Sequence, residues 1–140
     1  MKAARIQPTG VVARLSNSEG AVIAARSGAS ARIALSASME GFSPLELLDA
    51  SLAACLAISV KLAARKLGFD DRIDAVRIEV KGEKADDLPA RVARQTCRFA
   101  IEGRIGAEDR RRLIAEAHAL CTISHTLAGG LEIVDGAPLD

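Results

Sequence analysis

The feature that most constrains this fold is one long apolar helix predicted over residues 41–68. Its start is well marked, because Ser43 is a good N-cap, Pro44 suits the first helical position and Glu46 completes a capping box. From residue 50 to residue 60 nearly every side chain is apolar, so we expect the helix to be enclosed on most of its sides. A helix of this kind is predicted at the centre of a domain.

Strands are predicted on both sides of this helix. Three short ones come before it, rich in β-branched and small apolar residues and separated by turn segments: 11–16, 21–26 and 31–36. After it, apolar and polar residues alternate in two segments that are predicted to pair as a long hairpin, 73–83 and 93–103. Residues 131–135 are predicted to form a final strand.

A second, amphipathic helix is predicted over residues 107–121, followed by a turn or a short further helix. Strands, helix, hairpin, helix and strand, in this order, indicate an α+β fold with both helices packed on antiparallel sheets. The 140 residues are expected to form a single domain, 1–140.

Composition excludes several functions. The formal net charge is +1 and aromatic residues make up 2% of the chain, which argues against nucleic acid as a partner, since such binding needs basic charge and stacking rings. The longest charge-free apolar run, residues 50–60, is too short to span a bilayer, and residues 1–16 contain no apolar stretch of the length expected in a signal sequence. We therefore expect a cytoplasmic protein without a membrane partner.

Three cysteines are the candidate reactive groups, and an odd number in a reducing compartment does not suggest a disulfide framework. Cys97 lies on the apolar face of its predicted strand and is interpreted as a core residue. Cys55 has small neighbours on the central helix, which fits either core packing or reactivity. Cys121 precedes a sequence that can begin a new helical turn, where free N–H groups would lower its pKa. The two helices face one core, so these two sulfurs could meet.

Metal binding is not expected. His118, Cys121 and His125 do not have a standard zinc spacing, and a fourth ligand is not evident. His118 is interpreted as a surface residue at the flank of its helix. No cofactor is predicted.

Two separated motifs together resemble those of the OsmC/Ohr family of thiol peroxidases, and in particular its less characterised OsmC-like branch. They are GFSPLELLDASLAACLA at residues 41–57 and AHALCTISHTL at residues 117–127. The order of the predicted elements agrees with the family along nearly the whole chain. The resemblance implies an OsmC-like fold: an intertwined homodimer with two long central helices back to back and a site at the dimer interface.

The resemblance also implies a mechanism, used in oxidative or osmotic stress defence. Cys55 matches the peroxidatic cysteine, whose thiolate reduces an organic hydroperoxide and becomes a sulfenic acid. Cys121 matches the resolving cysteine, which condenses with that sulfenic acid to a disulfide. A dithiol reductant then restores both thiols by exchange.

The family activates its peroxidatic thiol with an arginine held by a glutamate. In the best-studied branches this glutamate directly follows the motif proline, whereas this chain has Leu45 there and Glu46 one residue later. One residue is about 100° of rotation on a helix, so Glu46 is either the catalytic carboxylate or only a helix cap. Arg32 is the first candidate for the arginine, and Arg14 and Arg26 are others.

The same residues leave a second function open. A non-catalytic OsmC-like dimer would use its interface pocket to bind a small apolar ligand or to sense redox state. The position of Glu46 favours this alternative, and the retention of both Cys55 and Cys121 favours the peroxidase.

Overall fold

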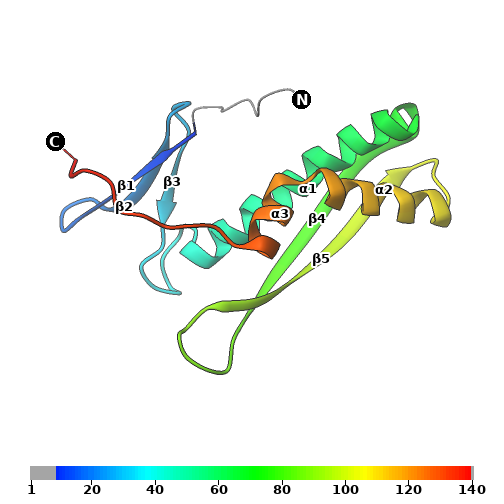
Figure 1. The fold of residues 1–140 in the computed structure, drawn as a ribbon. Coiled ribbons are helices and arrows are strands. Elements are labelled where there is room, and N and C mark those ends of the chain that lie inside the picture. Colours follow the sequence, from blue (N-terminus) through cyan, green and yellow to red (C-terminus); the bar gives the residue numbers. More distant parts are fainter. Residues whose placement is uncertain (1–8, 140) are drawn as a thin grey trace. The chain divides into compact units, whose positions relative to one another are not determined.

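The structure is a computed structural model that describes residues 9–139. The chain divides into two units, Met1–Leu47 and Leu48–Asp140, and each contains its own antiparallel sheet (Figure 1). Helices and antiparallel sheets together confirm the predicted α+β class.

The first unit is a three-stranded meander. Strands β1 (Val11–Ser16), β2 (Gly20–Ala25) and β3 (Ser30–Ile33) lie in the order β1-β2-β3, and both neighbouring pairs are antiparallel. All three were predicted from the sequence: β1 has the predicted bounds, β2 is shifted by one residue, and β3 begins one residue and ends three residues earlier than predicted. Short strands linked by tight turns pair with their sequence neighbours, which is the simplest antiparallel connection.

The chain leaves this sheet through a close backbone contact. Phe42 N–H donates to the Arg32 carbonyl at 2.9 Å, and Ala34 N–H donates to the Phe42 carbonyl at 2.9 Å. Gly41 has φ +140° there, and a Cβ atom on it would lie 2.8 Å from the Arg32 carbonyl oxygen. Only glycine fits this approach, so the residues just before the helix are fixed against β3.

Helix α1 (Pro44–Leu67) begins and ends as predicted. Ser43 N–H donates to Glu46 Oε1 at 2.9 Å, and Glu46 N–H donates to Ser43 Oγ at 3.1 Å, which is the predicted capping box. Gly68 has φ +77° and its N–H donates to the Arg65 carbonyl, so it ends the helix.

The second unit is built on a long hairpin of β4 (Ile73–Lys84) and β5 (Val92–Gly103), joined to α1 through the short 3₁₀ turn η1 (Asp70–Arg72). Its register places the predicted apolar residues directly opposite one another, as cross-strand pairs on one face: Val76 with Ile101, Ile78 with Phe99, and Val80 with Cys97. This face of the hairpin packs against the helices.

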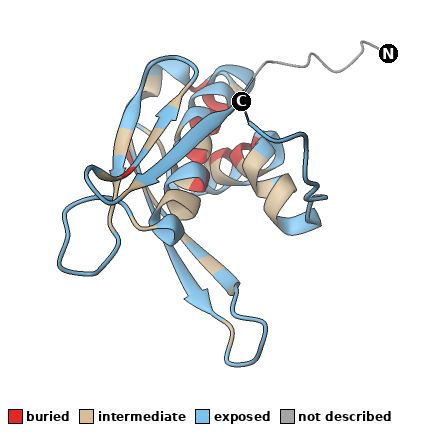
Figure 2. Ribbon diagram, turned by 90° about the vertical axis from the view of Figure 1, so that its left-hand side faces the viewer, coloured by how far each residue is buried: buried red, intermediate tan, exposed pale blue. Residues whose placement is uncertain are grey.

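The core of the second unit lies between the hairpin, α1 and α2 (Ala107–Leu120). Leu56 and Val60 of α1 and Leu113 of α2 are fully buried, and the buried residues form a band along the helices (red in Figure 2). Gln95 of β5 adds a polar contact to α1, donating to Asp49 Oδ1 at 2.9 Å. A further short helix, α3 (Thr122–Gly129), follows α2.

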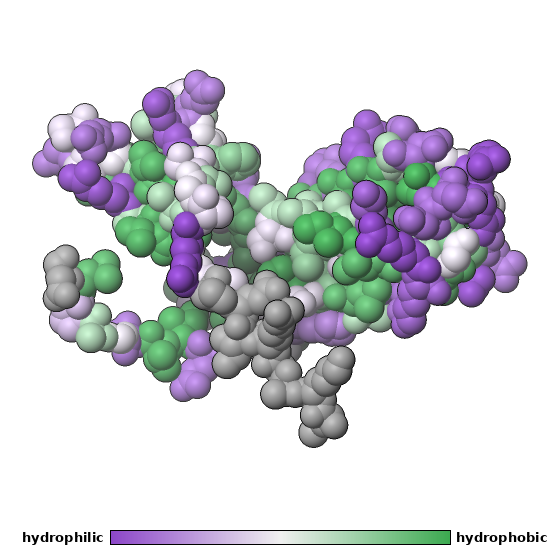
Figure 3. Space-filling view, turned by 90° about the horizontal axis from the view of Figure 1, so that it is seen from above, coloured by the Kyte–Doolittle hydropathy of each residue, from purple (hydrophilic) through white to green (hydrophobic). Residues whose placement is uncertain are grey.

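The expectation that α1 is enclosed on most sides is wrong for the single chain. Ala54, Ile58 and Leu62 are spaced four residues apart and form an exposed stripe, with Ile58 63% exposed and Leu62 47% exposed. Side chains of this kind leave apolar area at the surface of the molecule (green in Figure 3). The sequence is apolar all round the helix, but one chain supplies only enough structure to cover one side.

Among the described residues, α1 is the one helix long and apolar enough to cross a membrane by length and composition. The core helix of a soluble protein has the same length and composition. One side of α1 packs against the hairpin and α2 in the core of the second unit.

The predicted final strand is also wrong. Residues 131–135 lie outside any helix or strand, and Leu131, Ile133 and Val134 are exposed. A strand needs a neighbour to take up its backbone hydrogen bonds, and none of the strands within residues 9–139 pairs with this segment. Local β propensity alone does not make a strand.

Candidate thiol site

The centre of the candidate site is Cys121, which lies at the junction of α2 and α3. It is the C-cap of α2 and the N-cap of α3, and its Sγ accepts a hydrogen bond from Ser124 N–H at 3.3 Å. The side chain is 0% exposed. The predicted position of Cys121 at the start of a new helical turn is therefore confirmed.

The surroundings of Cys121 favour its thiolate. Burial alone raises the pKa of Cys121, but hydrogen bonds from the Ser124 side chain, from the Cys55 thiol and from the backbone N–H groups of Ser124 and Ile123 together outweigh it. The pKa of Cys121 is therefore lowered. The helix N-terminus acts in the same direction, since its free N–H groups carry partial positive charge.

The structure brings Cys55 to Cys121. Leu52, Leu56 and Cys121 form a buried cluster between the two helices, and the half-buried Cys55 packs against it. Cys55 also favours the thiolate of Cys121 and so contributes to the lowered pKa of Cys121. The apolar faces of α1 and of the α2–α3 junction thus meet in one core, as the sequence indicated.

Cys97 is a third thiol in the same place. It packs against the cluster of Leu52, Leu56 and Cys121 from β5. Burial raises the pKa of the Cys97 thiol, and the negative charge of Cys121 raises it further. The sequence interpretation as a core residue describes its packing but missed its neighbours, which only the strand register and the helix packing reveal.

A cavity of about 410 Å³ opens beside Cys97. Its lining includes Gln95, His118 and Ser124, with Leu52 and Leu127 as apolar walls. The residues that line it include neither Cys55 nor Cys121. Cys97 is therefore the member of the thiol cluster that faces this cavity.

His118 is half-buried in the wall of this cavity rather than a surface residue, so the sequence interpretation was wrong. Its ring meets the edge of Phe99 with centroids 5.5 Å apart, and Nδ1 lies 3.5 Å from Ser124 Oγ. Phe99 and Ser124 come from β5 and α3, and sequence spacing along α2 alone does not reveal them.

The His125 side chain contacts the backbone: its Nε2 lies 2.8 Å from the Ala119 carbonyl oxygen. Within residues 9–139, no group of three His, Cys, Asp or Glu side chains is placed to hold a metal ion.

The two other predicted site residues belong to the first unit. Glu46 holds the capping box, and hydrogen bonds from the backbone and then the side chain of Ser43 lower the pKa of Glu46. Arg32 is exposed on β3 and has no ion pair among the residues that the structure describes. The roles of both residues stay predictions.

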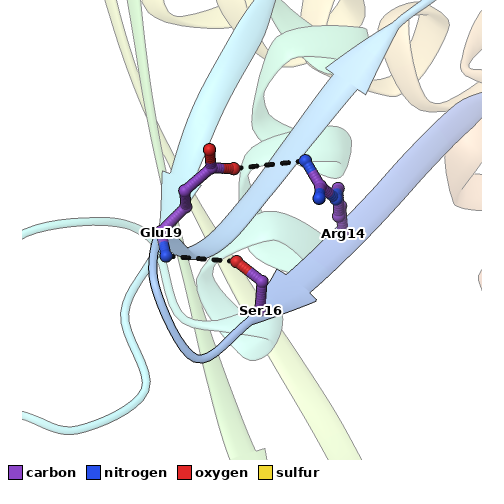
Figure 4. A network of polar contacts seen from close by, with 3 residues as sticks. All are labelled: Arg14, Ser16 and Glu19. Atoms are coloured by element: carbon purple, nitrogen blue, oxygen red, sulfur yellow. Dashed lines mark hydrogen bonds and ion pairs between the residues drawn. The ribbon is translucent and has the colours of Figure 1, made fainter.

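Arg14, the alternative cation, is already engaged. Its Nη1 donates to Glu19 Oε2 at 3.2 Å across the β1–β2 turn, where Glu19 N–H also donates to Ser16 Oγ at 3.1 Å (Figure 4). Arg32 forms no such ion pair among the residues that the structure describes, so it remains the first candidate for the activating arginine.

An α+β chain with two thiols packed in one cluster between two helices has the groups that thiol–disulfide chemistry requires. The family model for OsmC-like proteins matches residues 36–134, which contain both cysteine motifs. The chain therefore belongs to the OsmC-like protein family, as its motifs indicated. No curated protein matches the sequence.

Solved structures share the fold at low sequence identity. The OsmC-like protein from Mycoplasma pneumoniae is 17% identical, with TM-score 0.76 over 88% of this chain and 89% of its own. The organic hydroperoxide resistance protein OhrB of Bacillus subtilis is 21% identical, with TM-score 0.70 over 88% and 92%. An OsmC-like protein of unknown function from Vibrio cholerae is 11% identical, with TM-score 0.66 over 86% and 94%.

Proposed function

We propose that this protein reduces organic hydroperoxides with a cysteine pair. The observation that carries the proposal is that Cys55 packs against the buried Cys121 in one cluster between the two helices, where the pKa of Cys121 is lowered. Two adjacent thiols of which one is readily ionised are what peroxide reduction through a disulfide requires. Relatives of the same fold that are named as organic hydroperoxide resistance proteins agree with this function.

In the proposed reaction, Cys55 is the peroxidatic residue. It is half-buried, whereas Cys121 is fully buried, so a hydroperoxide reaches Cys55 first. Transfer of the Cys55 proton to its neighbour Cys121 leaves a Cys55 thiolate. That thiolate attacks the terminal oxygen of the hydroperoxide and the O–O bond breaks. The alkoxide takes the proton from Cys121 and leaves as an alcohol, and Cys55 becomes a sulfenic acid.

The second step uses Cys121 as the resolving residue. Its thiolate attacks the sulfenic sulfur of Cys55 and the S–O bond breaks. Hydroxide leaves and takes a proton from solvent to become water, and a Cys55–Cys121 disulfide forms. A dithiol reductant supplies two electrons and restores both thiols. In this scheme a guanidinium stabilises the Cys55 thiolate, with Arg32 as the first candidate, and Glu46 is the candidate carboxylate for orienting it.

The working form is proposed to be a cytoplasmic homodimer of a single OsmC-like domain. The stripe of Ala54, Ile58 and Leu62 is apolar, exposed and continuous along α1, which is the type of surface that a second copy of the helix covers. Each α1 would then be enclosed on both sides.

The function is tested by adding one equivalent of an alkyl hydroperoxide to the reduced protein and measuring its intact mass. Rapid loss of two hydrogens, abolished in Cys55→Ser, supports the proposal. No reaction within minutes contradicts it. Cys97→Ser serves as the matched control, because a Cys55–Cys121 disulfide does not need Cys97 to form.

One observation favours the alternative, a non-catalytic dimer that binds a small apolar ligand or senses redox state. Glu46 Oε1 is occupied by Ser43 N–H in the capping box, and Leu45 stands at the position where the peroxidase branches have their carboxylate. The same mass measurement separates the two functions.

A further inference from the structure

The three thiols of the cluster differ in how they meet solvent. Cys121 is 0% exposed, and Cys55 and Cys97 are half-buried. Cys97 lines the cavity of about 410 Å³ together with His118 and Ser124. In a disulfide between Cys55 and Cys121 the Cys121 sulfur is buried, whereas Cys97 lies at the wall of a cavity.

Cys97 also lies near the buried partner of that disulfide. Both residues pack in the cluster around Leu52 and Leu56, and the negative charge of Cys121 raises the pKa of the Cys97 thiol. The proximity to one of the paired sulfurs and the adjoining cavity are independent observations. Cys97 can therefore exchange with the buried disulfide on one side and with a reductant in the cavity on the other.

We infer that Cys97 is a relay thiol through which the oxidised protein is reduced, an inference that rests on the proposed Cys55–Cys121 chemistry. Cys97 loses its proton and attacks Cys121 Sγ. A Cys97–Cys121 disulfide forms, the Cys55–Cys121 bond breaks, and Cys55 leaves as a thiolate that takes up the proton. No electrons are gained or lost in this exchange.

The external step then takes place at the cavity. One thiolate of a dithiol attacks Cys97 Sγ, and Cys121 leaves as a thiolate, for which its hydrogen bonds to Ser124 and the α3 N-terminus make it a good leaving group. The second thiol of the reductant then attacks the mixed disulfide. The dithiol is oxidised to its disulfide and Cys97 is returned as a thiol.

The same features make Cys97 a poor first target for oxidation. Burial and the charge of Cys121 raise the pKa of Cys97, so it stays protonated while Cys121 is ionised. Once Cys121 is bound in a disulfide, that charge is gone and the pKa of Cys97 falls towards its usual value. Oxidation of Cys121 thus removes one of the two causes that keep Cys97 protonated.

Peptide mapping tests the relay directly, because trypsin places the three cysteines on separate peptides: residues 33–61, 95–98 and 113–140. The reduced protein is oxidised with limiting diamide, which needs no peroxide chemistry, and is then quenched with a maleimide. We expect two cross-linked pairs of peptides, 33–61 with 113–140 and 95–98 with 113–140. When one pair is enriched, thiol exchange is expected to restore the original ratio of the two pairs. If the pair of peptides 33–61 and 113–140 is the only one found at every time point, the relay is overturned.

The rate at which a dithiol reduces the oxidised protein is the second test of the relay. The oxidised Cys97→Ser protein is expected to be reduced by dithiothreitol about tenfold or more slowly than the wild type, because attack at the cavity wall is lost. Cys97→Ala repeats the test with a different packing change. Thr96→Ala, on the exposed face of the same strand, is the matched control. Reduction of both Cys97 variants at the wild-type rate overturns the inference.

The two proposals fail in different ways. If peroxide does not oxidise the protein but diamide yields both exchanging disulfides, the peroxidase function is wrong and the relay stands as thiol exchange within the cluster. If peroxide oxidises Cys55 and Cys121 but Cys97 never enters a disulfide, the function stands and the relay is wrong.

Discussion

Cys121 Sγ accepts a hydrogen bond from Ser124 N–H at 3.3 Å, at the point where α2 ends and α3 begins. Cys121 is the C-cap of α2 and the N-cap of α3. Its sulfur also accepts the hydrogen bonds that lower the pKa of Cys121. Stability and reactivity therefore depend on the same sulfur, and the first prediction uses this.

Ser124→Ala removes the side-chain hydrogen bond to Cys121 and keeps the backbone one. We expect the pKa of Cys121 to rise, because a group that favours the thiolate is lost. Ultraviolet absorbance of the thiolate, followed against pH, measures the shift. Thr126→Ala is the control, since the Thr126 hydroxyl donates to the Thr122 carbonyl instead. An unchanged first titration step in Ser124→Ala would contradict the assignment.

The lowered pKa of Cys121 also predicts how stability changes with pH. The folded protein holds the thiolate more tightly than the unfolded chain does, so the extra stability is present above the unfolded thiol pKa and is lost as pH falls through the folded one. The free energy of unfolding of the wild type, relative to Cys121→Ala, is expected to rise with pH between these two values. Urea unfolding at several pH values measures it, and a difference that falls with pH would refute the sign.

Cys121→Ser separates the two steps of the proposed reaction. Without the resolving thiol, Cys55 is expected to stop at the sulfenic acid after one equivalent of hydroperoxide and to be oxidised further by an excess. Intact mass then shows a gain of oxygen in place of the loss of two hydrogens. Trapping with a sulfenic-acid reagent locates the oxygen on peptide 33–61. A disulfide in this variant at the wild-type rate would assign the resolving role to another thiol.

Glu46→Gln distinguishes a catalytic carboxylate from a cap. The amide oxygen still accepts the hydrogen bond from Ser43 N–H, so the helix start is kept while the charge is removed. If Glu46 orients Arg32, the rate of Cys55 oxidation falls while the thermal midpoint is nearly unchanged. Arg32→Lys is expected to give a similar loss, and Arg14→Lys is the control. Wild-type rates in both Glu46→Gln and Arg32→Lys would leave Glu46 as a cap alone.

Leu56 and Ile58 lie two residues apart on α1 but on opposite sides. Leu56 is fully buried, so Leu56→Ala is expected to cost about 2–5 kcal/mol of stability. Ile58 is exposed in the single chain, so Ile58→Asp is expected to keep the fold and to weaken the proposed dimer. Circular dichroism and sedimentation measure the two effects. An Ile58→Asp protein that remains dimeric would place the interface elsewhere.

Gly103 tests the end of the hairpin. It has φ +144°, and a Cβ atom there would overlap the Arg72 carbonyl oxygen, so Gly103→Ala requires the backbone to move. We expect a loss of about 2 kcal/mol or more in urea unfolding. Gly106→Ala is the control, because nothing lies within 4 Å of a Cβ atom at that position. Equal stability of the two variants would show that the β5 end is free to relax.

The start of α1 was predictable from sequence because its signals are local. Ser43, Pro44 and Glu46 specify the cap within four residues, and the hydrogen bonds are those that the motif requires. The hairpin was predictable for the same reason, since alternation fixes which side chains share a face. The meeting of Cys55 and Cys121 followed from the apolar faces of their helices.

What the sequence did not reveal depends on contacts between distant segments. Cys97 joins the thiol cluster only because the β4–β5 register turns it towards Cys121, which its own neighbours do not indicate. Residues 131–135 have the pattern of a strand, but pairing needs a partner that local propensity does not specify. His118 was misassigned because the cavity beside it is built by β5 and α3.

The stripe of Ala54, Ile58 and Leu62 has a consequence for how the protein behaves in solution. If a second copy covers this stripe, folding and association become one equilibrium, and the melting temperature rises with protein concentration. A dilute sample would then be less stable than a concentrated one of identical sequence. Cellular abundance would therefore set how much of the protein is competent to act.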